Sequence, residues 1–127
     1  MNNTSRILVV DDDPDIALMI KIMLEYKGYS VLLASRTDMV NNILEHNAIS
    51  LIIMDMLLSG ANGTDICRSL KQNVQSAPIP IIMISAHPNA REICLEAGAD
   101  DFISKPFDIE DMLGKIQGFI HSAEPQR

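Results

Sequence analysis

The chain has 127 residues, of which 47% are apolar, 21% are charged and only 4% are aromatic. These values are typical of a single folded domain whose core is built mainly from aliphatic and methionine side chains. The formal net charge of −7 argues against nucleic acid or an anionic membrane as a direct partner, because both require a basic surface.

The sequence carries no sign of export or of a membrane anchor. The segment MNNTSR is followed by only four apolar residues before an acidic cluster, so it does not make a signal peptide. No apolar run approaches the length that spans a membrane. Cys67 and Cys94 lack the C-x-x-C spacing of metal and redox sites, so we expect two reduced, semi-buried thiols. The expected location is cytoplasmic, with no membrane partner.

Five apolar runs predict five strands. They cover Ile7 to Val10, Val31 to Ala34, Leu51 to Met54, Ile79 to Ile84, and Phe102 to Ile103. Most of these runs are nearly unbroken and rich in Ile and Val, as expected for strands that are buried on both faces of a sheet.

Segments with helical periodicity separate the runs. The first helix is expected to begin at Pro14, with Asp13 as its cap, and to end at Gly28. Its inward face is predicted to hold Ile16, Met19, Ile20, Met23 and Leu24. The second helix is predicted over residues 36–46, with Ser35 as its cap.

Three further helices are expected in the second half of the chain. One follows Asn62-Gly63, a short one ends near Gly98, and the last begins after Asp108 and is buried as far as Ile120. Beyond it, residues 122–127 are polar and include a proline, so they are interpreted as a tail or the start of a linker. Residues 1–121 are thus predicted to form one domain.

The strict alternation of strand and helix indicates an α/β fold with parallel strands and right-handed crossovers. Five such units predict a flavodoxin-like, doubly wound, five-stranded parallel sheet of order 2-1-3-4-5 with five helices. In that order ligands bind at the carboxyl ends of the first and third strands.

Chemically active residues follow four of the five predicted strands. They are Asp11 and Asp12 after the first strand, Asp55 after the third, Ser85 after the fourth and Lys105 after the fifth. Clustered carboxylates form a hard oxygen site suited to Mg²⁺. A carboxylate that faces both a metal and a lysine is well placed to attack a phosphoryl group, and Asp55, alone on the central strand, is the predicted nucleophile.

The segments ILVVDDDP, MISA, EAGADDF and SKPF, together with the Asp55 run, resemble the receiver domains of two-component response regulators over nearly the whole chain. The resemblance implies a signalling domain rather than an enzyme. Asp55 would accept a phosphoryl group from a phosphohistidine on a sensor histidine kinase or a histidine phosphotransfer protein.

The resemblance also implies roles for individual residues. Mg²⁺ would be bound by Asp12 directly, by Asp11 largely through water, by Asp55 and by the backbone carbonyl of Leu57. The remaining matches are Ser85 and Phe102 as the switch pair, Lys105 as the family lysine, and a cis bond between Lys105 and Pro106. Two further positions, Leu57 and His87, would tune the lifetime of the phosphorylated form.

The sequence departs from the family pattern in three places. Ser59 stands where proline is usual, Asn62 replaces a common acidic residue, and the segment between Ser85-Ala86 and AGAD is short. A shortened segment there affects the face formed by the fourth helix, the fifth strand and the fifth helix. The sequence therefore leaves open a homodimer through that face.

Two alternatives belong to other functional classes. A haloacid-dehalogenase-like phosphohydrolase would also use Asp55 as a nucleophile, but it normally has a second aspartate where Leu57 stands here. A flavodoxin-like nucleotide-binding module would have a glycine-rich first loop, whereas this chain has DDDPD.

Overall fold

The computed structural model describes residues 5–58 and 61–123, with the backbone alone for residues 121–123. The strands are β1 (Arg6–Val10), β2 (Ser30–Ala34), β3 (Leu51–Asp55), β4 (Leu57–Leu58), β5 (Ala61–Asn62), β6 (Ile81–Ser85) and β7 (Asp101–Ser104). The helices are α1 (Pro14–Tyr26), α2 (Asp38–His46), α3 (Gly63–Gln72), α4 (Ala90–Glu96) and α5 (Ile109–Ala123).

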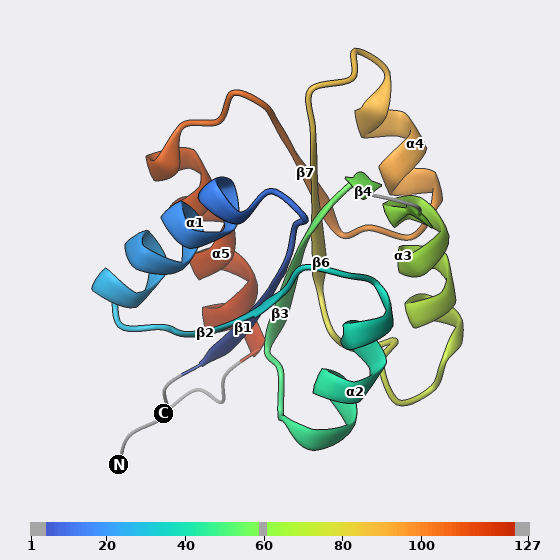
Figure 1. The fold of residues 1–127 in the computed structure, drawn as a ribbon, viewed down its shortest axis with the longest axis horizontal. Coiled ribbons are helices and arrows are strands. Elements are labelled where there is room, and N and C mark those ends of the chain that lie inside the picture. The colour runs from blue at the N-terminus through green and yellow to red at the C-terminus, as the bar shows by residue number, and fades with distance from the viewer. Residues whose placement is uncertain (1–4, 59–60, 124–127) are drawn as a thin grey trace.

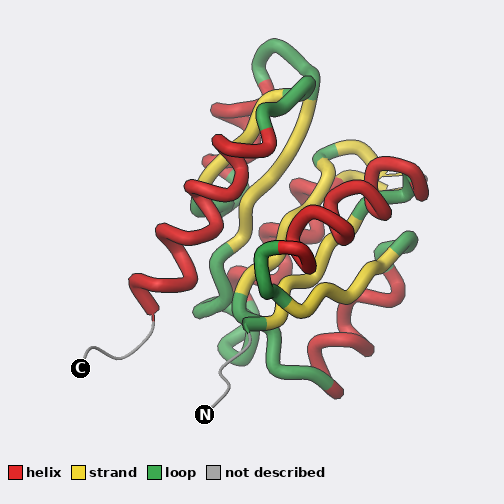
Figure 2. The backbone as a smooth tube through the Cα atoms, turned by 90° about the vertical axis from the view of Figure 1, so that its left-hand side faces the viewer, coloured by secondary structure: helices red, strands yellow, loops and turns green. Residues whose placement is uncertain are grey.

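Five parallel strands form the central sheet in the order β2-β1-β3-β6-β7. This is the predicted order 2-1-3-4-5, because β6 and β7 are the fourth and fifth of the predicted strands. Helices α1 and α5 cover one face of the sheet, and α2, α3 and α4 cover the other (Figure 1). Figure 2 shows the sheet lying between these two helical layers. The flavodoxin-like, doubly wound fold is confirmed.

The sheet divides the hydrophobic core into two clusters. Alternate residues of β1 point to opposite faces, so Leu8 and Val10 pack toward α2, α3 and α4, whereas Ile7 and Val9 pack toward α1 and α5. All five residues of β3 are buried. Buried central strands with helices on both faces explain why the apolar runs in the sequence do not alternate with polar residues.

Several helix signals in the sequence are confirmed. Asp13 caps α1, and its side chain accepts hydrogen bonds from the backbone N–H groups of Asp15 and Ile16. Gly28 follows α1 and Gly98 follows α4, both with positive φ, a conformation that favours glycine. None of the helices in the described part of the chain is long and apolar enough to cross a membrane.

Two predictions about the first two helices are wrong. Met19 is exposed, because α1 packs on the sheet through Ala17, Ile20 and Leu24 instead. The second helix begins at Asp38 rather than residue 36, and its cap is Thr37, not Ser35. The preceding turn is tight, with the backbone N–H of Met39 donating to the carbonyl of Arg36, which delays the helix by two residues.

Other differences concern lengths and burial. The short antiparallel pair β4–β5 follows the central strand and was not predicted. Helix α5 continues to Ala123, three residues past Ile120, so its backbone enters the segment interpreted as a tail. The remaining tail residues, 124–127, lie outside the described residues, as does Ser59. Cys67 and Cys94 are fully buried rather than semi-buried.

Candidate functional site

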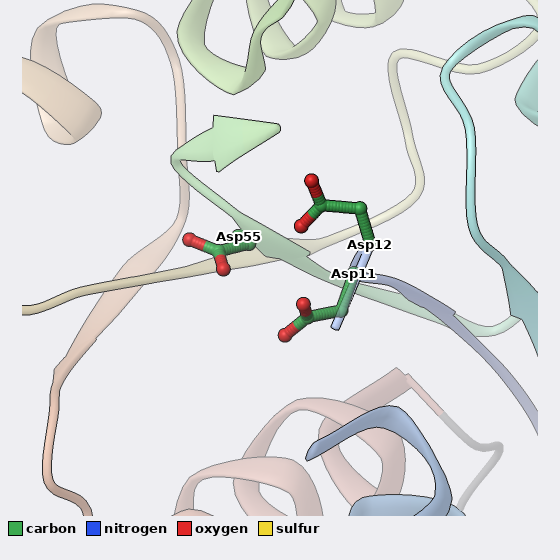
Figure 3. Close-up of side chains that lie close together, drawn as sticks. All are labelled: Asp11, Asp12 and Asp55. Atoms are coloured by element: carbon green, nitrogen blue, oxygen red, sulfur yellow. The ribbon is translucent and has the colours of Figure 1, made fainter. Parts of the chain in front are cut away.

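Three carboxylates meet at the carboxyl edge of the sheet. Asp11 and Asp12 follow β1, and Asp55 is the last residue of the neighbouring strand β3. Figure 3 shows their side chains close together at the ends of these two strands. One ligand oxygen from each residue lies within 4.8 Å of those of the other two. Parallel pairing of β1 with β3 is therefore what brings together residues 44 positions apart in the sequence.

Asp55 is largely buried, and both of its carboxylate oxygens have partners. Lys105 Nζ donates to Oδ2 over 2.9 Å, and the backbone N–H of Leu57 donates to Oδ1 over 3.2 Å. The ammonium lies opposite the carboxylate because Lys105 follows β7, two strands away in the sheet. This arrangement fixes the rotamer of Asp55 and supplies one positive charge next to three negative ones.

Asp11 is the most buried of the three carboxylates. The backbone N–H of Asp13 donates to its Oδ1 over 2.9 Å. Burial raises the pKa of the Asp11 carboxyl above its ordinary value, and the negative charge of Asp55 acts in the same direction. The hydrogen bond from Asp13 and the charge of Lys105 oppose that rise. The cluster therefore carries concentrated negative charge that a cation would stabilise.

Ser85 and Phe102 lie on the two strands that follow β3 in the sheet, β6 and β7. Ser85 is buried at the end of β6, and its Oγ accepts a hydrogen bond from the backbone N–H of His87 over 3.0 Å. The carbonyl of Ser85 accepts from the backbone N–H of Lys105, which ties the ends of β6 and β7 together. Phe102 is already buried in the core cluster under α2, α3 and α4. The peptide bond between Lys105 and Pro106 is cis, as the resemblance implied.

The two positions expected to tune the phosphorylation lifetime differ in their surroundings. Leu57 is 61% exposed, although its backbone N–H donates a hydrogen bond to Asp55 Oδ1. His87 is also exposed, and its Nδ1 accepts a hydrogen bond from the backbone N–H of Asn89. The imidazole of His87 is thus held by its own loop.

Gly63 lies next to the site, although the sequence indicated only that a helix starts there. The backbone of Gly63, at the first position of α3, packs against the carbonyl group of Asp55. A glycine at a helix start where larger residues are usually tolerated is the signal that could have indicated such close packing.

Chemically, the site combines hard oxygen ligands with a nucleophile and a fixed cation. Asp11, Asp12 and Asp55 can together hold a divalent metal ion that prefers oxygen. The Asp55 carboxylate is paired with Lys105, whose ammonium can also neutralise charge on a bound anion. The donor set thus suits a metal-assisted reaction of a phosphorylated substrate.

Comparisons with known proteins agree with this description. The family model described as "Response regulator receiver domain" matches residues 7–117. The response regulator ArlR of Staphylococcus saprophyticus is 35% identical over 123 residues, covering 97% of this chain and 55% of that protein. The DNA-binding response regulator MtrA of Mycolicibacterium smegmatis is 31% identical, covering 95% of this chain and 53% of that protein. The chain thus spans about half the length of these curated relatives.

A solved structure gives a similar result. The receiver domain of the sensor histidine kinase PA1611 from Pseudomonas aeruginosa has a TM-score of 0.85 and 29% identity, covering 94% of this chain and 99% of that one. That structure has a magnesium ion coordinated in its active site cleft. Neither the family model nor these relatives support the haloacid-dehalogenase-like alternative. With the fold, the acidic cluster and the family match in agreement, this chain belongs to the response regulator receiver domains of two-component signalling systems.

Proposed function

We propose that Asp55 is the phosphoacceptor of this receiver domain. The observation that carries the proposal is the geometry around one carboxylate: Asp55 lies at the end of the central strand, 2.9 Å from Lys105 Nζ and within 4.8 Å of ligand oxygens of two further carboxylates. The phosphodonor would be a phosphohistidine on a sensor histidine kinase or a histidine phosphotransfer protein.

The proposed cofactor is Mg²⁺, held by the side chains of Asp11, Asp12 and Asp55 and by the backbone carbonyl of Leu57. The three carboxylates supply the hard anionic oxygens that this ion prefers. When bound, Mg²⁺ would neutralise charge on the carboxylates and on the oxygens of the incoming phosphoryl group.

The other steps of phosphoryl transfer would be carried out by residues of the chain itself. A carboxylate oxygen of Asp55 would attack phosphorus as the phosphorus–nitrogen bond of the donor breaks and its electron pair leaves with the imidazole. Lys105 would move from the carboxylate to an oxygen of the phosphoryl group. The domain would thus assist its own phosphorylation and dephosphorylation, while the net process transfers a signal.

The switch pair would carry the change to the surface. Ser85 Oγ, which accepts from the backbone N–H of His87 in this structure, would turn toward the phosphoryl group and donate its own O–H to it. Since Phe102 is already buried, the rearrangement would begin in the loop between β6 and α4. The face of α4, β7 and α5 remains the candidate surface for a homodimer.

Helix α1 offers a docking surface for the phosphodonor protein. Leu18, Met19 and Ile22 are large apolar residues with exposed fractions of 50%, 43% and 57%. The helix begins directly after Asp13, so this strip adjoins the acceptor edge, and apolar side chains at helical spacing suit a partner helix. Ile22→Glu should slow phosphotransfer from a sensor kinase and leave the reaction with a small phosphodonor unchanged.

The extent of the domain remains part of the proposal. We propose that the receiver domain covers residues 1–121 and that the tail or linker, residues 122–127, begins within the last turn of α5, which ends at Ala123. The net charge of −7 supports the view that these residues do not themselves bind nucleic acid. The relative MtrA is named a DNA-binding protein, but this chain covers only 53% of its length.

The direct test is incorporation of phosphate. The protein is incubated with Mg²⁺ and acetyl phosphate, and the hydroxylamine-sensitive phosphate is measured for the parent and for Asp55→Asn. We expect incorporation in the parent and none in the variant. Asp100→Asn is the matched control, because it changes the same residue type in a lysine pair away from the site. Equal incorporation in the parent and Asp55→Asn would overturn the assignment.

A further inference from the structure

The start of helix α3 lies against the backbone of the acceptor residue. The N–H of Gly63 donates to the carbonyl of Met56 over 2.7 Å. A Cβ atom at position 63 would overlap the carbonyl oxygen of Asp55, and it would lie 2.9 Å from the carbonyl oxygen and 3.1 Å from the Cα of Met56. Real Cβ atoms essentially never come within 3.0 Å of a neighbouring heavy atom, and both carbonyl oxygens would lie inside that limit. No side chain therefore fits at position 63 without displacing the end of the acceptor strand.

The need for glycine here is one of space and not of backbone conformation. Among the described glycines, only Gly28 and Gly98 have positive φ, so the backbone of Gly63 is one that other residues adopt. Gly63 is not the cap either, since the side chain of Asn62 caps α3 by accepting from the backbone N–H of Thr64. The remaining reason for a glycine at position 63 is the close approach of α3 to the backbone of Asp55.

This contact belongs to a small clamp around the loop that follows the acceptor. In the β4–β5 pair, Leu57 lies opposite Asn62 and Leu58 lies opposite Ala61. The hydrogen bond from Gly63 to Met56 continues this pairing by one step toward Asp55. The segment 56–58, which includes the proposed carbonyl ligand at Leu57, is thereby held against the start of α3. We refer to segments 56–58 and 61–63 together as the acceptor clamp.

We infer that Gly63 is a positioning residue for the metal and acceptor site. This inference rests on the proposed function, because it assigns Gly63 a role toward Mg²⁺ and Asp55. The hydrogen bond from Leu57 N–H to Asp55 Oδ1 runs directly from the clamp to the acceptor carboxylate. A Cβ at position 63 pushes the backbone of Asp55 and Met56 away from α3 and so changes the distances between Asp55, its neighbours and any bound ion.

Small displacements matter at this site because Mg²⁺ requires nearly ideal octahedral geometry. Groups that orient the ligands of a metal ion typically affect its affinity by roughly 10- to 100-fold when they are changed. Gly63 itself has no charge and touches no reacting atom, so its effect on the chemistry passes entirely through the position of Asp55 and the 56–58 segment.

The test compares glycine-to-alanine changes at two helical positions. Gly63→Ala introduces the overlap described above, whereas Gly114→Ala in α5 meets no atom within 4 Å. Lys71→Met serves as a second control, because it removes an ion pair and lowers stability away from the site. Amide NMR spectra of the parent and the three variants are followed during titration with Mg²⁺, and urea unfolding is measured in parallel.

We expect the dissociation constant for Mg²⁺ to rise roughly tenfold in Gly63→Ala and to stay within about twofold of the parent in both controls. The amide signals of residues 55–57 should already differ from the parent before Mg²⁺ is added. A glycine with a merely structural role would give the pattern of Lys71→Met, namely lower stability with unchanged affinity. That result would overturn the inference.

If Gly63→Ala does not fold, Asn62→Ala provides the test of whether the clamp affects Mg²⁺ binding. It removes the cap of α3, including the acceptor of two hydrogen bonds from Thr64, and should weaken Mg²⁺ binding several-fold by loosening the same clamp. An unchanged affinity in that variant would contradict the inference. If the parent binds Mg²⁺ but takes no phosphate from acetyl phosphate, the proposed function fails while the affinity comparison still tests Gly63.

Discussion

Two lysine–aspartate pairs lie at opposite ends of the parallel strands, one at the carboxyl ends and one at the amino ends, and their surroundings differ. Lys105 meets Asp55 at the carboxyl edge over 2.9 Å, and Lys71 meets Asp100 at the amino edge over 2.8 Å. Lys71 Nζ also donates to the carbonyls of Ala77 and Ile79, so all three of its N–H groups are used. Among the described residues, Asp55 is the one hydrogen-bond acceptor that Lys105 Nζ reaches.

The aspartates differ in the same way. Asp100 Oδ2 accepts from the backbone N–H of Ile81 as well as from Lys71, and it joins the start of β6 to the turn before β7. Asp55 instead has two further carboxylates close by. A saturated pair fastens two segments together. The Lys105–Asp55 pair has unused donors and like-charged neighbours, so it can still bind a cation or a phosphoryl group. We therefore call the Lys71–Asp100 pair an anchor and the Lys105–Asp55 pair a reactive site.

The largest effect should come from the carboxylates at the reactive edge. Asp12→Ala should abolish Mg²⁺ binding over the range in which the parent saturates, since it removes one of three anionic ligands. Asp13→Ala should leave the affinity nearly unchanged and lower the free energy of unfolding by about 1 kcal/mol, because Asp13 caps α1. Calorimetric titration and urea unfolding measure the two quantities. Greater damage to Mg²⁺ binding from Asp13→Ala would show that the roles within the triplet are misassigned.

Substitution of Lys71 should lower stability, whereas substitution of Lys105 should slow phosphorylation. Lys71→Met removes the lysine donor from two carbonyls and from the Asp100 carboxylate, which keeps only its hydrogen bond from Ile81. It should cost about 2 kcal/mol of unfolding free energy, with phosphorylation unaffected. Lys105→Met should cost less stability but slow phosphorylation by acetyl phosphate roughly tenfold or more, because one charge-stabilising group is lost. If Lys105→Met proves the more destabilising and phosphorylates normally, the distinction between anchor and reactive site fails.

The lifetime of the phosphorylated form should depend on Leu57 more than on His87. Leu57 offers no polar atom to orient a water molecule, so Leu57→Asn should accelerate loss of phosphate several-fold. His87→Ala should have the smaller effect, because its imidazole is bonded to the backbone of Asn89 within its own loop. Decay is measured at saturating Mg²⁺ for the parent and both variants. A Leu57→Asn protein that decays at the parent rate, beside a much slower His87→Ala protein, would reverse the ranking.

The smallest expected effect is that of Asp11 on the free energy of unfolding in the absence of Mg²⁺. The pKa of Asp11 is raised in the folded protein by burial, so at pH 7 its charge opposes folding. Asp11→Asn should therefore raise the free energy of unfolding in the absence of Mg²⁺. The gain should shrink as the pH falls through the raised pKa toward 3.8, where the folded parent is also neutral at this position. Urea unfolding at several pH values checks this prediction. A less stable variant at pH 7 would show that the stronger hydrogen bond from Asp13 N–H to a charged carboxylate outweighs the cost of burying that charge.

Much of the molecule followed from local patterns in the sequence. Unbroken runs such as Leu51 to Met54 indicated buried parallel strands, because only helices on both faces remove the need for polar alternation. The cap at Asp13 and the terminators at Gly28 and Gly98 were predicted, since these residues act within their own turn. Once the strand order was inferred, the residues after each strand were expected to share one edge.

Other features were decided only by contacts between distant parts of the chain. Met19 has the right period to be buried, but the sheet meets α1 through Ala17 instead, and the orientation of a helix depends on the surface it packs against. The β4–β5 pair and the close approach of Gly63 to Asp55 need the folded loop, because their partners are set by packing rather than by spacing. The same holds for the two lysine pairs: each lysine is 29 or more residues from its aspartate, so only the tertiary structure could determine which is saturated and which is free to react.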